Sequence, residues 1–486
     1  MSISLKAQST KKIEILNADY SYANMKTHSE YWRLIGNISF KHNNAIMYCD
    51  SAYHYTEINK MKAFGNIIIN QGDSITITGK KLTYFGSKNQ AKLEENVILL
   101  DNHMRLETDQ ITYNLISNIA SYPYFGKIID NEKIIHSKRG EYQSNTHNFI
   151  FTDSVIVFGK DYTIQTDNMR YNSNNETAYF FGPSNILSDN KTIYCEDGWY
   201  NTKDNISQFK NNAYITTKSY VLRGDSLYYD KNLGYGKAMM NVYIIDTVEN
   251  MTITGELGEY FEQDEYVKIS NRPVLEILFE ADTLSMKADR FISKHKVGEK
   301  RILAYNNIKF FKTDLQGKCD SLSYNFSDSI VKMFKQPVLW SENFQITADS
   351  ISMLMYKGTI NHAFLKSKPM IISQEDSLDY NQIKGKSMMT YFKRNKIQSI
   401  DVNGNGQSIF IINDEKTKDK IGLNYTECSD LTLYFQNNKL NMVNYKVKPN
   451  SITTPYQEIK EKNRYLKGFT WRQEETPKEK KDILIE

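Results

Sequence analysis

Hydrophobic and polar residues alternate along most of the chain, and this alternation predicts β-strands. Leu93, Val97 and Leu99, for example, occupy positions of one parity. A period of two is typical of a strand with one buried face. Polar turn sequences, such as residues 172–175 (NSNN), separate these segments. Apart from a short stretch near the C-terminus, no long window shows the 3.6-residue period of a helix, so the pattern predicts an all-β chain.

A tyrosine recurs every 29 residues in the N-terminal half. The series comprises Tyr84, Tyr113, Tyr142, Tyr171, Tyr200 and Tyr229. Each tyrosine ends the pattern small, acidic, any, apolar, any, aromatic, with residues 224–229 (GDSLYY) as a clear copy. Weaker copies continue at looser intervals in the C-terminal half. Because periods of about 20–50 residues mark stacked repeats, we predict one elongated antiparallel repeat structure.

The parity of the apolar residues changes within each tyrosine-bearing segment. Ile75 and Ile77 share one parity, whereas Leu82 and Tyr84 share the other. A flat strand would place these two pairs on opposite faces. A bulge or bend at the acidic position would place both pairs inside, and a short break between two separate strands would lead to much the same shape. Both alternatives predict two facing sheets that meet at a corner.

Composition and charge narrow the functional classes. Aromatic residues make up 13% of the chain, and 34 tyrosines against 8 prolines favour strands. The net charge is only +4, with basic and acidic residues interspersed, which argues against nucleic-acid binding. The sequence has no run of about 18 apolar residues, so no transmembrane helix is predicted. The first ten residues lack the apolar core of a signal peptide, so composition does not indicate a compartment.

The four cysteines are the first candidates for chemistry. Cys49, Cys195 and Cys319 occupy the small position just before the acidic residue, and the fourth cysteine is Cys428. They are far apart in sequence and form no Cys-x-x-Cys pair. We therefore expect buried structural thiols rather than a metal site or a disulfide.

A ladder of acidic residues is the second candidate. It comprises Asp50, Asp109, Asp167, Glu196, Asp225, Asp282, Asp320, Asp349 and Asp376. Paired carboxylates can hydrolyse glycosides, but catalysis needs unique groups and these recur in nearly every repeat. We expect them to cap backbone N–H groups at the bend. The histidines form no pair at metal-ligand spacing, and no nucleotide or hydrolase fingerprint occurs. The sequence thus predicts no catalytic residue, no metal, no cofactor and no enzyme.

Several motifs, read together with the repeat, resemble a known family. Residues 49–53 (CDSAY), 63–67 (AFGNI) and 224–229 (GDSLYY) are similar to motifs of the OstA/LptA family, in particular to OstA-like proteins of Bacteroidetes-type bacteria. Residues 403–409 (NGNGQSI) and 468–472 (GFTWR) resemble the closing motifs of that group. The resemblance extends over most of the chain.

The resemblance implies a fold and a domain organisation. The fold would be an elongated antiparallel β-jellyroll whose two sheets form a V-shaped trough. Its repeats would occupy residues 12–395, divided into sub-blocks 12–170 and 171–395. A closing segment, 396–477, and a charged tail, 478–486, would follow.

The resemblance also implies a periplasmic role in lipopolysaccharide transport and outer-membrane assembly. The implied cargo is the acyl chains of lipopolysaccharide, and the implied partners are an inner-membrane Lpt extractor complex and an outer-membrane Lpt translocon. Open first and last strands would allow edge-to-edge association with like domains. Parity within the strands predicts the residues that line the lipid groove. These are Ile67, Ile69, Leu82, Tyr84, Val97, Leu99, Ile111, Tyr113, Val155, Val157 and Tyr171.

Two alternatives compete with this reading. A parallel β-helix, acting as an adhesin or as a polysaccharide-binding or polysaccharide-cleaving protein, also has a period in this range. It would need inward apolar stacks from about three strands per coil. An outer-membrane barrel is the other alternative, but the repeats and the closing segment leave little sequence for one.

Overall fold

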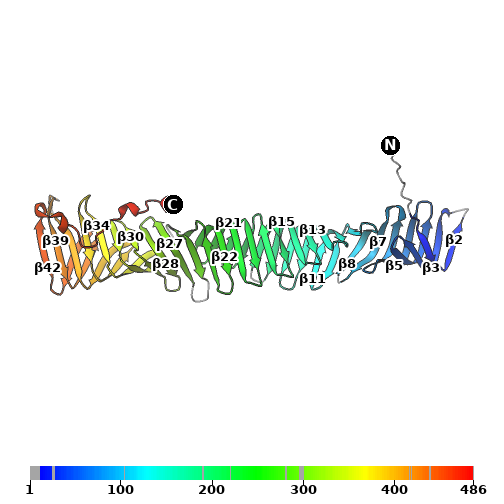
Figure 1. Cartoon of the computed structure of the whole chain (residues 1–486), viewed down its shortest axis with the longest axis horizontal. Coiled ribbons are helices and arrows are strands. Elements are labelled where there is room, and N and C mark those ends of the chain that lie inside the picture. The colour runs from blue at the N-terminus through cyan, green and yellow to red at the C-terminus, as the bar shows by residue number, and fades with distance from the viewer. Residues whose placement is uncertain are drawn as a thin grey trace, which may run out of the picture. The chain divides into compact units, whose positions relative to one another are not determined.

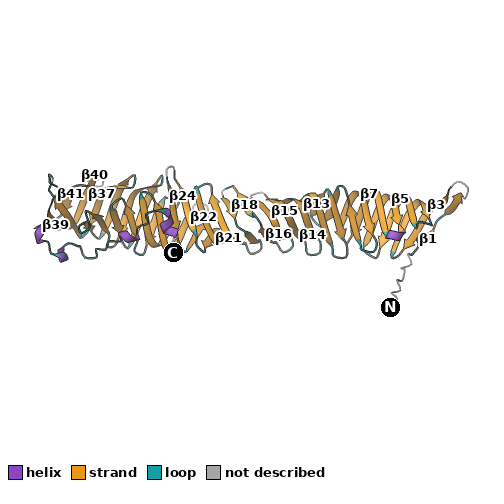
Figure 2. Ribbon diagram, turned by 90° about the horizontal axis from the view of Figure 1, so that it is seen from above, coloured by secondary structure: helices purple, strands orange, loops and turns teal. Residues whose placement is uncertain are grey.

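The computed structural model describes residues 11–24, 28–102, 104–188, 191–218, 220–279, 282–294, 300–414, 416–417, 419–436 and 439–484. The chain forms two compact units. Unit 1 comprises Met1–Lys218 and Asp225–Leu233, and unit 2 comprises Ser219–Gly224 and Gly234–Glu486. In each unit, strands lie side by side in one continuous stack (Figure 1), and the few helices are short (Figure 2).

Unit 1 is built from antiparallel strands joined by tight turns. They are β1 Glu14–Asn17, β2 Tyr20–Asn24, β3 His28–His42, β4 Ala45–Tyr55, β5 Lys60–Gln71, β6 Ile75–Phe85, β7 Gln90–Asp101, β8 Met104–Asn114, β9 Ile119–Tyr122, β10 Gly126–Asp130, β11 Lys133–Ser137, β12 Arg139–Gln143, β13 Asn148–Phe158, β14 Thr163–Asn172, β15 Thr177–Ser188, β16 Lys191–Asn201, β17 Ile206–Lys210, β18 Tyr214–Thr217 and β20 Ser226–Asp230. One short 3₁₀ helix, η1 Gly86–Lys88, precedes β7.

Unit 2 is also built from antiparallel strands joined by turns, and it ends in short helices. Its strands are β19 Tyr220–Arg223, β21 Tyr235–Asp246, β22 Met251–Phe261, β23 Tyr266–Ser270, β24 Val274–Leu278, β25 Thr283–Lys287, β26 Arg290–Lys294, β27 Arg301–Lys312, β28 Leu315–Asn325, β29 Ile330–Phe334, β30 Val338–Ser341, β31 Phe344–Thr347, β32 Ser350–Tyr356, β33 Thr359–Lys366, β34 Met370–Gln374, β35 Tyr380–Lys384, β36 Ser387–Lys393, β37 Lys396–Asn403, β38 Gly406–Asn413, β39 Lys420–Cys428, β40 Asp430–Gln436, β41 Lys439–Lys446 and β42 Asn450–Pro455. The helices are η2 Tyr456–Glu458, η3 Glu461–Asn463, η4 Gln473–Glu475 and α1 Lys480–Leu484.

β-bulges interrupt the pairing of the long strands near their middle. In the pair β5–β6, Gly65 and Asn66 together face the single residue Lys80. Gly65 has φ 75° and Asn66 has φ 30°, backbone angles that Gly and Asn adopt at low cost. Similar left-handed pairs occur at residues 95–96, 153–154, 240–241 and 306–307. At such a bulge, two residues of one strand face a single residue of its partner, so the inward-facing positions of the two strands change parity relative to each other.

Burial confirms the predicted change of parity. Ile75, Ile77, Leu82 and Tyr84 are all buried, although the two pairs have opposite parity. The bend therefore turns both halves of the strand inward, as the sequence predicts. The strands pair antiparallel in both units, which confirms the all-β antiparallel jellyroll and rules out the parallel β-helix.

The bend divides each long strand into two parts. One part belongs to one half-sheet and the other part to a second half-sheet that faces the first. The turns between strands form two rims, which contact each other on the side away from the bend, here called the mouth. In unit 1, rim A carries the turns at residues 42–45, 71–75, 101–104, 130–133 and 158–163. Rim B carries the turns at residues 55–60, 85–90, 114–119, 143–148 and 172–177.

In unit 2, residues 456–484 form a strap that runs back along the outside of one half-sheet (Figures 1 and 2). Gln345 of β31 is fully buried. Its amide accepts a hydrogen bond from the backbone N–H of Arg472 and donates one to the carbonyl of Thr470, both at 2.7 Å. Gln382 holds the strap in the same way. The strap ends in α1, where Ile483 is buried. Among the described helices, none is long and apolar enough to cross a membrane.

Candidate functional site

The structure places the eleven predicted groove residues together between the half-sheets of unit 1. All are buried, and the most exposed of them, Val157, has only 4% of its surface exposed. Neighbouring strands bring Ile69 beside Ile77 and Leu99 beside Leu106. The interior is therefore continuous and apolar along the stack. That these residues contact lipid stays a prediction.

Burial also affects the periodic tyrosines that end these strands. Desolvation raises the pKa of the Tyr113 phenol to about 12 and raises the pKa values of Tyr84, Tyr142 and Tyr171 as well. These phenols are therefore neutral hydrogen-bond donors over the whole physiological pH range. The hydroxyl groups of Tyr84, Tyr142 and Tyr171 meet residues of the opposite rim. That of Tyr113 donates to Oδ1 of Asn118 on its own rim at 3.3 Å.

Side chains from the two rims bridge the mouth of unit 1. The Tyr84 hydroxyl lies 2.5 Å from Nδ1 of His42. Gln71 donates to Oδ1 of Asn118 at 2.6 Å. We call this series, continued by the two carboxylate pairs of the next paragraph, the mouth ladder.

Two buried carboxylates continue the mouth ladder. Tyr142 donates to Oδ2 of Asp101 at 2.6 Å, and Tyr171 donates to Oδ2 of Asp130 at 2.7 Å. Asp101 and Asp130 each have only 3% of their surface exposed. Beside them, Lys133 of rim A forms an ion pair with Glu176 of rim B. The facing half-sheets are thus joined at the mouth as well as at the bend.

Sequence reasoning placed the periodic tyrosines inside but did not identify their partners. A signal for the partners exists, because His42, Gln71, Asp101 and Asp130 follow one another at intervals of 29, 30 and 29 residues. They are the last residues of their strands on rim A. This second 29-residue series of polar residues, offset from the tyrosines, indicates residues that stack along one rim, but it does not specify which tyrosine each of them faces.

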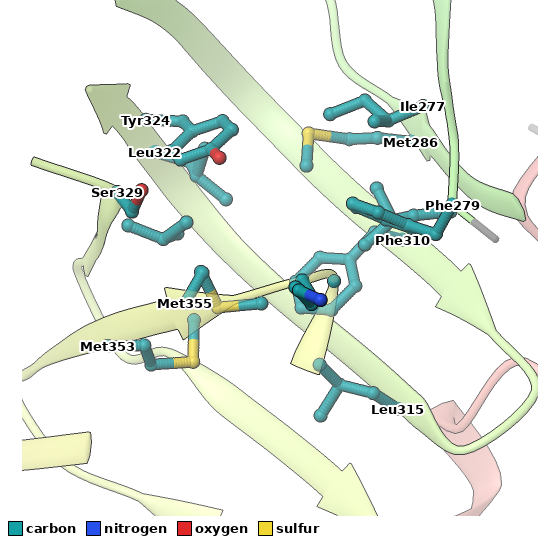
Figure 3. A pocket seen from close by; sticks show the side chains of 14 residues that line it. Ile277, Phe279, Met286, Phe310, Leu315, Leu322, Tyr324, Ser329, Met353 and Met355 are labelled. Carbon is teal, nitrogen blue, oxygen red and sulfur yellow. The ribbon is translucent and has the colours of Figure 1, made fainter. Parts of the chain in front are cut away.

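Unit 2 contains an apolar cavity of about 100 Å³ near its mouth (Figure 3). Its lining includes Phe279, Met286, Phe310, Met353 and Met355. Cavities of about 150 Å³ hold a molecule the size of benzene, so this one is too small for an acyl chain without further opening. The unbranched side chains of methionine can adapt to such opening.

The rim beside this cavity is closed by an apolar contact. Gly358 lies in the turn after β32 with φ 75°, and a Cβ atom there would lie 2.5 Å from the Phe279 ring. Phe279 therefore packs directly against the backbone of the opposite rim, and Gly358 permits this close approach. The exposed Lys357 stands next to Gly358.

The four cysteines are free and buried, as predicted. Desolvation, followed by the charge of the neighbouring Asp50, raises the pKa of Cys49 to about 12. Burial raises the pKa of Cys319 to about 12 as well. Such thiols are protonated and make poor nucleophiles or metal ligands. Within the described part of the chain, no group of three His, Cys, Asp or Glu residues could hold a metal ion.

The acidic ladder has a structural role at the bend, with a different partner from the one predicted. Asp50 accepts a hydrogen bond at 3.0 Å from the side-chain amide of Asn66, the left-handed residue of the neighbouring strand, rather than from a backbone N–H group. Asp320 pairs with Lys335 at 2.9 Å across the same kind of corner.

Two members of the predicted ladder are not at the bend. Asp282 and Asp376 lie in turns of the mouth instead, where they accept backbone hydrogen bonds, and Asp289 occupies the bend position near Asn307. The prediction was wrong for these two residues, because a small-acidic pattern also starts tight turns.

Parts of the chain are similar to one protein family and to one solved structure. Residues 10–167 and 160–225 match the profile of the OstA-like protein family. A comparison with curated proteins finds no match. Among solved structures, the chain is similar to LptH from Pseudomonas aeruginosa, described as the LptA-homologous periplasmic component of the lipopolysaccharide transport device. The two are 14% identical, with a TM-score of 0.22, over 24% of this chain and 81% of that protein.

Proposed function

Because the chain belongs to the OstA-like family, we propose that it is a periplasmic lipopolysaccharide transport protein. In this proposal it binds the acyl chains of lipid A between its half-sheets. It forms part of a bridge between the inner-membrane Lpt extractor complex and the outer-membrane Lpt translocon. Residues 12–395 supply the repeats of the conduit, residues 396–477 close it, and residues 478–486 form the charged tail.

The observation that carries this proposal is the continuous apolar interior of the repeats. Tyr84, Val97 and Ile111 are each at most 1% exposed. A conduit for acyl chains needs such an interior over many layers, whereas an enzyme needs unique polar groups at one place. The buried, protonated thiols and the structural carboxylates described above supply no such place.

Lipid entry requires the half-sheets to separate, and the energies are compatible with this. Burying about ten methylene groups gains about 8 kcal/mol. Opening one rung of the mouth ladder costs about 1–3 kcal/mol. One acyl chain can therefore offset the opening of several rungs.

The last strands offer a surface for the proposed edge-to-edge association. Most residues of β41 and β42 are exposed or half-buried. An open strand edge presents unpaired backbone groups to a like strand. We propose that another jellyroll of the Lpt bridge docks at this edge.

Photo-crosslinking in living cells tests the proposed lipid site. A photoreactive amino acid at Val97 or Ile111 in unit 1, or at Met355 in unit 2, should crosslink to lipopolysaccharide. The control is Lys92, which points outward and pairs with Glu94 at 2.8 Å. Equal labelling at inward and outward positions, or no labelling at either, would leave a scaffold without a conduit and would contradict the proposal.

A further inference from the structure

Lys133 is a cation held at the mouth of unit 1. It starts β11 on rim A, and only 11% of its side chain is exposed. Its ammonium group pairs with Oε2 of Glu176 on rim B and lies 5.9 Å from the centre of the Tyr171 ring. Tyr171 belongs to the apolar interior that the proposed acyl chains would occupy. The ammonium group therefore stands where that interior meets solvent.

Glu176 has further partners on its own rim. Thr202 donates to its carboxylate at 3.3 Å, and the backbone carbonyl of Glu176 accepts a hydrogen bond from the backbone N–H of Thr202 at 3.0 Å. The carboxylate can therefore leave Lys133 and keep a hydrogen bond. Glu176 is 25% exposed at the side chain, so water can also solvate it once it is released.

The neighbouring polar and aromatic groups have contacts of their own. Asp130, on the same turn, accepts the hydrogen bond of Tyr171. Tyr162 and Tyr200 pack edge to face across the mouth, with ring centres 5.5 Å apart. Among these groups, Glu176 is the anion that bridges Lys133 to rim B.

Unit 2 contains a similar arrangement. Lys300, beside β27, pairs with Asp246 at 2.8 Å and with Glu249 at 3.1 Å on the opposite rim. Asp246 is 4% exposed at the side chain and Lys300 is 24% exposed. A lysine joined to carboxylates across the mouth is therefore a repeated feature of the two units.

We propose that Lys133 is the phosphate-binding residue of unit 1, and that a phosphate of the bound lipid replaces Glu176 on it. The proposal rests on the proposed function, because acyl chains between the half-sheets place the headgroup at the mouth. A phosphate carries more charge and more acceptor oxygens than a carboxylate, and lysine binds it as a point charge. Replacing Glu176 removes the rim-to-rim ion pair, so phosphate binding and opening of the mouth are coupled. Lys300 has the equivalent role in unit 2.

Lipid binding to the purified full chain tests this assignment. The probes are lipid A with both phosphates and the same lipid with its phosphates removed. Lys133→Gln should weaken binding of the phosphorylated lipid by roughly tenfold relative to binding of the dephosphorylated lipid, which needs no phosphate contact. Glu176→Gln should strengthen binding of the phosphorylated lipid, because Lys133 loses its competing partner. The matched control is Lys138→Gln, which removes an exposed lysine paired with Asp153 at the bend.

The outcomes separate the inference from the proposed function. If the wild-type protein binds neither lipid, both are overturned. If it binds the two lipids equally well and Lys133→Gln changes neither affinity, the phosphate site is overturned and the lipid conduit stands. An equal loss of affinity for both lipids in Lys133→Gln, with the affinity restored in Lys133→Arg, would show that Lys133 has a purely structural role. That result would overturn the phosphate site. Inorganic phosphate should not compete with the lipid, and effective competition would overturn the assignment to a lipid headgroup.

Discussion

The hydrogen bond between Tyr171 and Asp130 allows a quantitative test of the mouth ladder. The change Tyr171→Phe removes one hydroxyl group and keeps the ring, so it leaves no large cavity. The hydroxyl donates to Oδ2 of Asp130 at 2.7 Å, and the two residues are only 2% and 3% exposed. Hydrogen bonds to a charged group contribute about 1.5–3 kcal/mol. We therefore expect the free energy of unfolding to fall by about 2 kcal/mol.

Urea unfolding of the wild type, both single variants and the double variant measures this contribution. The second single change is Asp130→Asn, and the double-mutant cycle isolates the pair energy. The control is Tyr179→Phe, because Tyr179 points outward and stacks with Arg170 at 4.4 Å. It should stay within about 0.5 kcal/mol of the wild type. A Tyr171→Phe variant as stable as the control, or a pair energy near zero, would refute the view that the mouth ladder holds the half-sheets together.

Three further predictions concern the strap and the buried phenols. Gln345→Ala removes two hydrogen bonds to the strap, so limited proteolysis should cut residues 456–484 faster, whereas Gln398→Ala on the exposed surface should leave the rate unchanged. Burial raises the pKa of Tyr113 from 10 to about 12. The stabilisation that comes from keeping this phenol neutral should be complete below about pH 10 and lost as the pH rises towards 12. Tyrosinate absorbance and unfolding curves would show the two changes together. The Arg472 guanidinium and the ammonium group of Lys318 on β28 lower the pKa of Glu475 from 4.5 to about 2, and Lys318 ties Glu475 to the sheet. Strap docking should therefore be complete above about pH 4.5 and weaken as the pH falls towards 2. A cleavage rate independent of pH in this window, measured with an acid-active protease, would contradict this.

The sequence by itself determined the fold class and the direction of most side chains. Ile77 and Leu82 have opposite parity and are both buried, because β6 bends between them opposite the two-residue bulge of β5. Alternation and bulges are local properties of a few consecutive residues, so one repeat carries enough information to predict them. The small position before the acidic residue likewise predicted the burial of Cys49 and Cys319. The errors at Asp282 and Asp376 arose because bends and turns use the same small and acidic residues.

Only the tertiary structure decided how the two rims meet. Tyr171 and Asp130 are 41 residues apart, and Gln345 and Arg472 are 127 residues apart. The distance between such residues depends on the twist and tilt accumulated over several strands, which no local pattern specifies. A 29-residue period predicts that equivalent residues stack along each rim, but it leaves open which repeat of one rim faces which repeat of the other. For this reason the apolar interior could be predicted from the sequence, whereas the mouth ladder that closes it, including the pair of Lys133 and Glu176, could not.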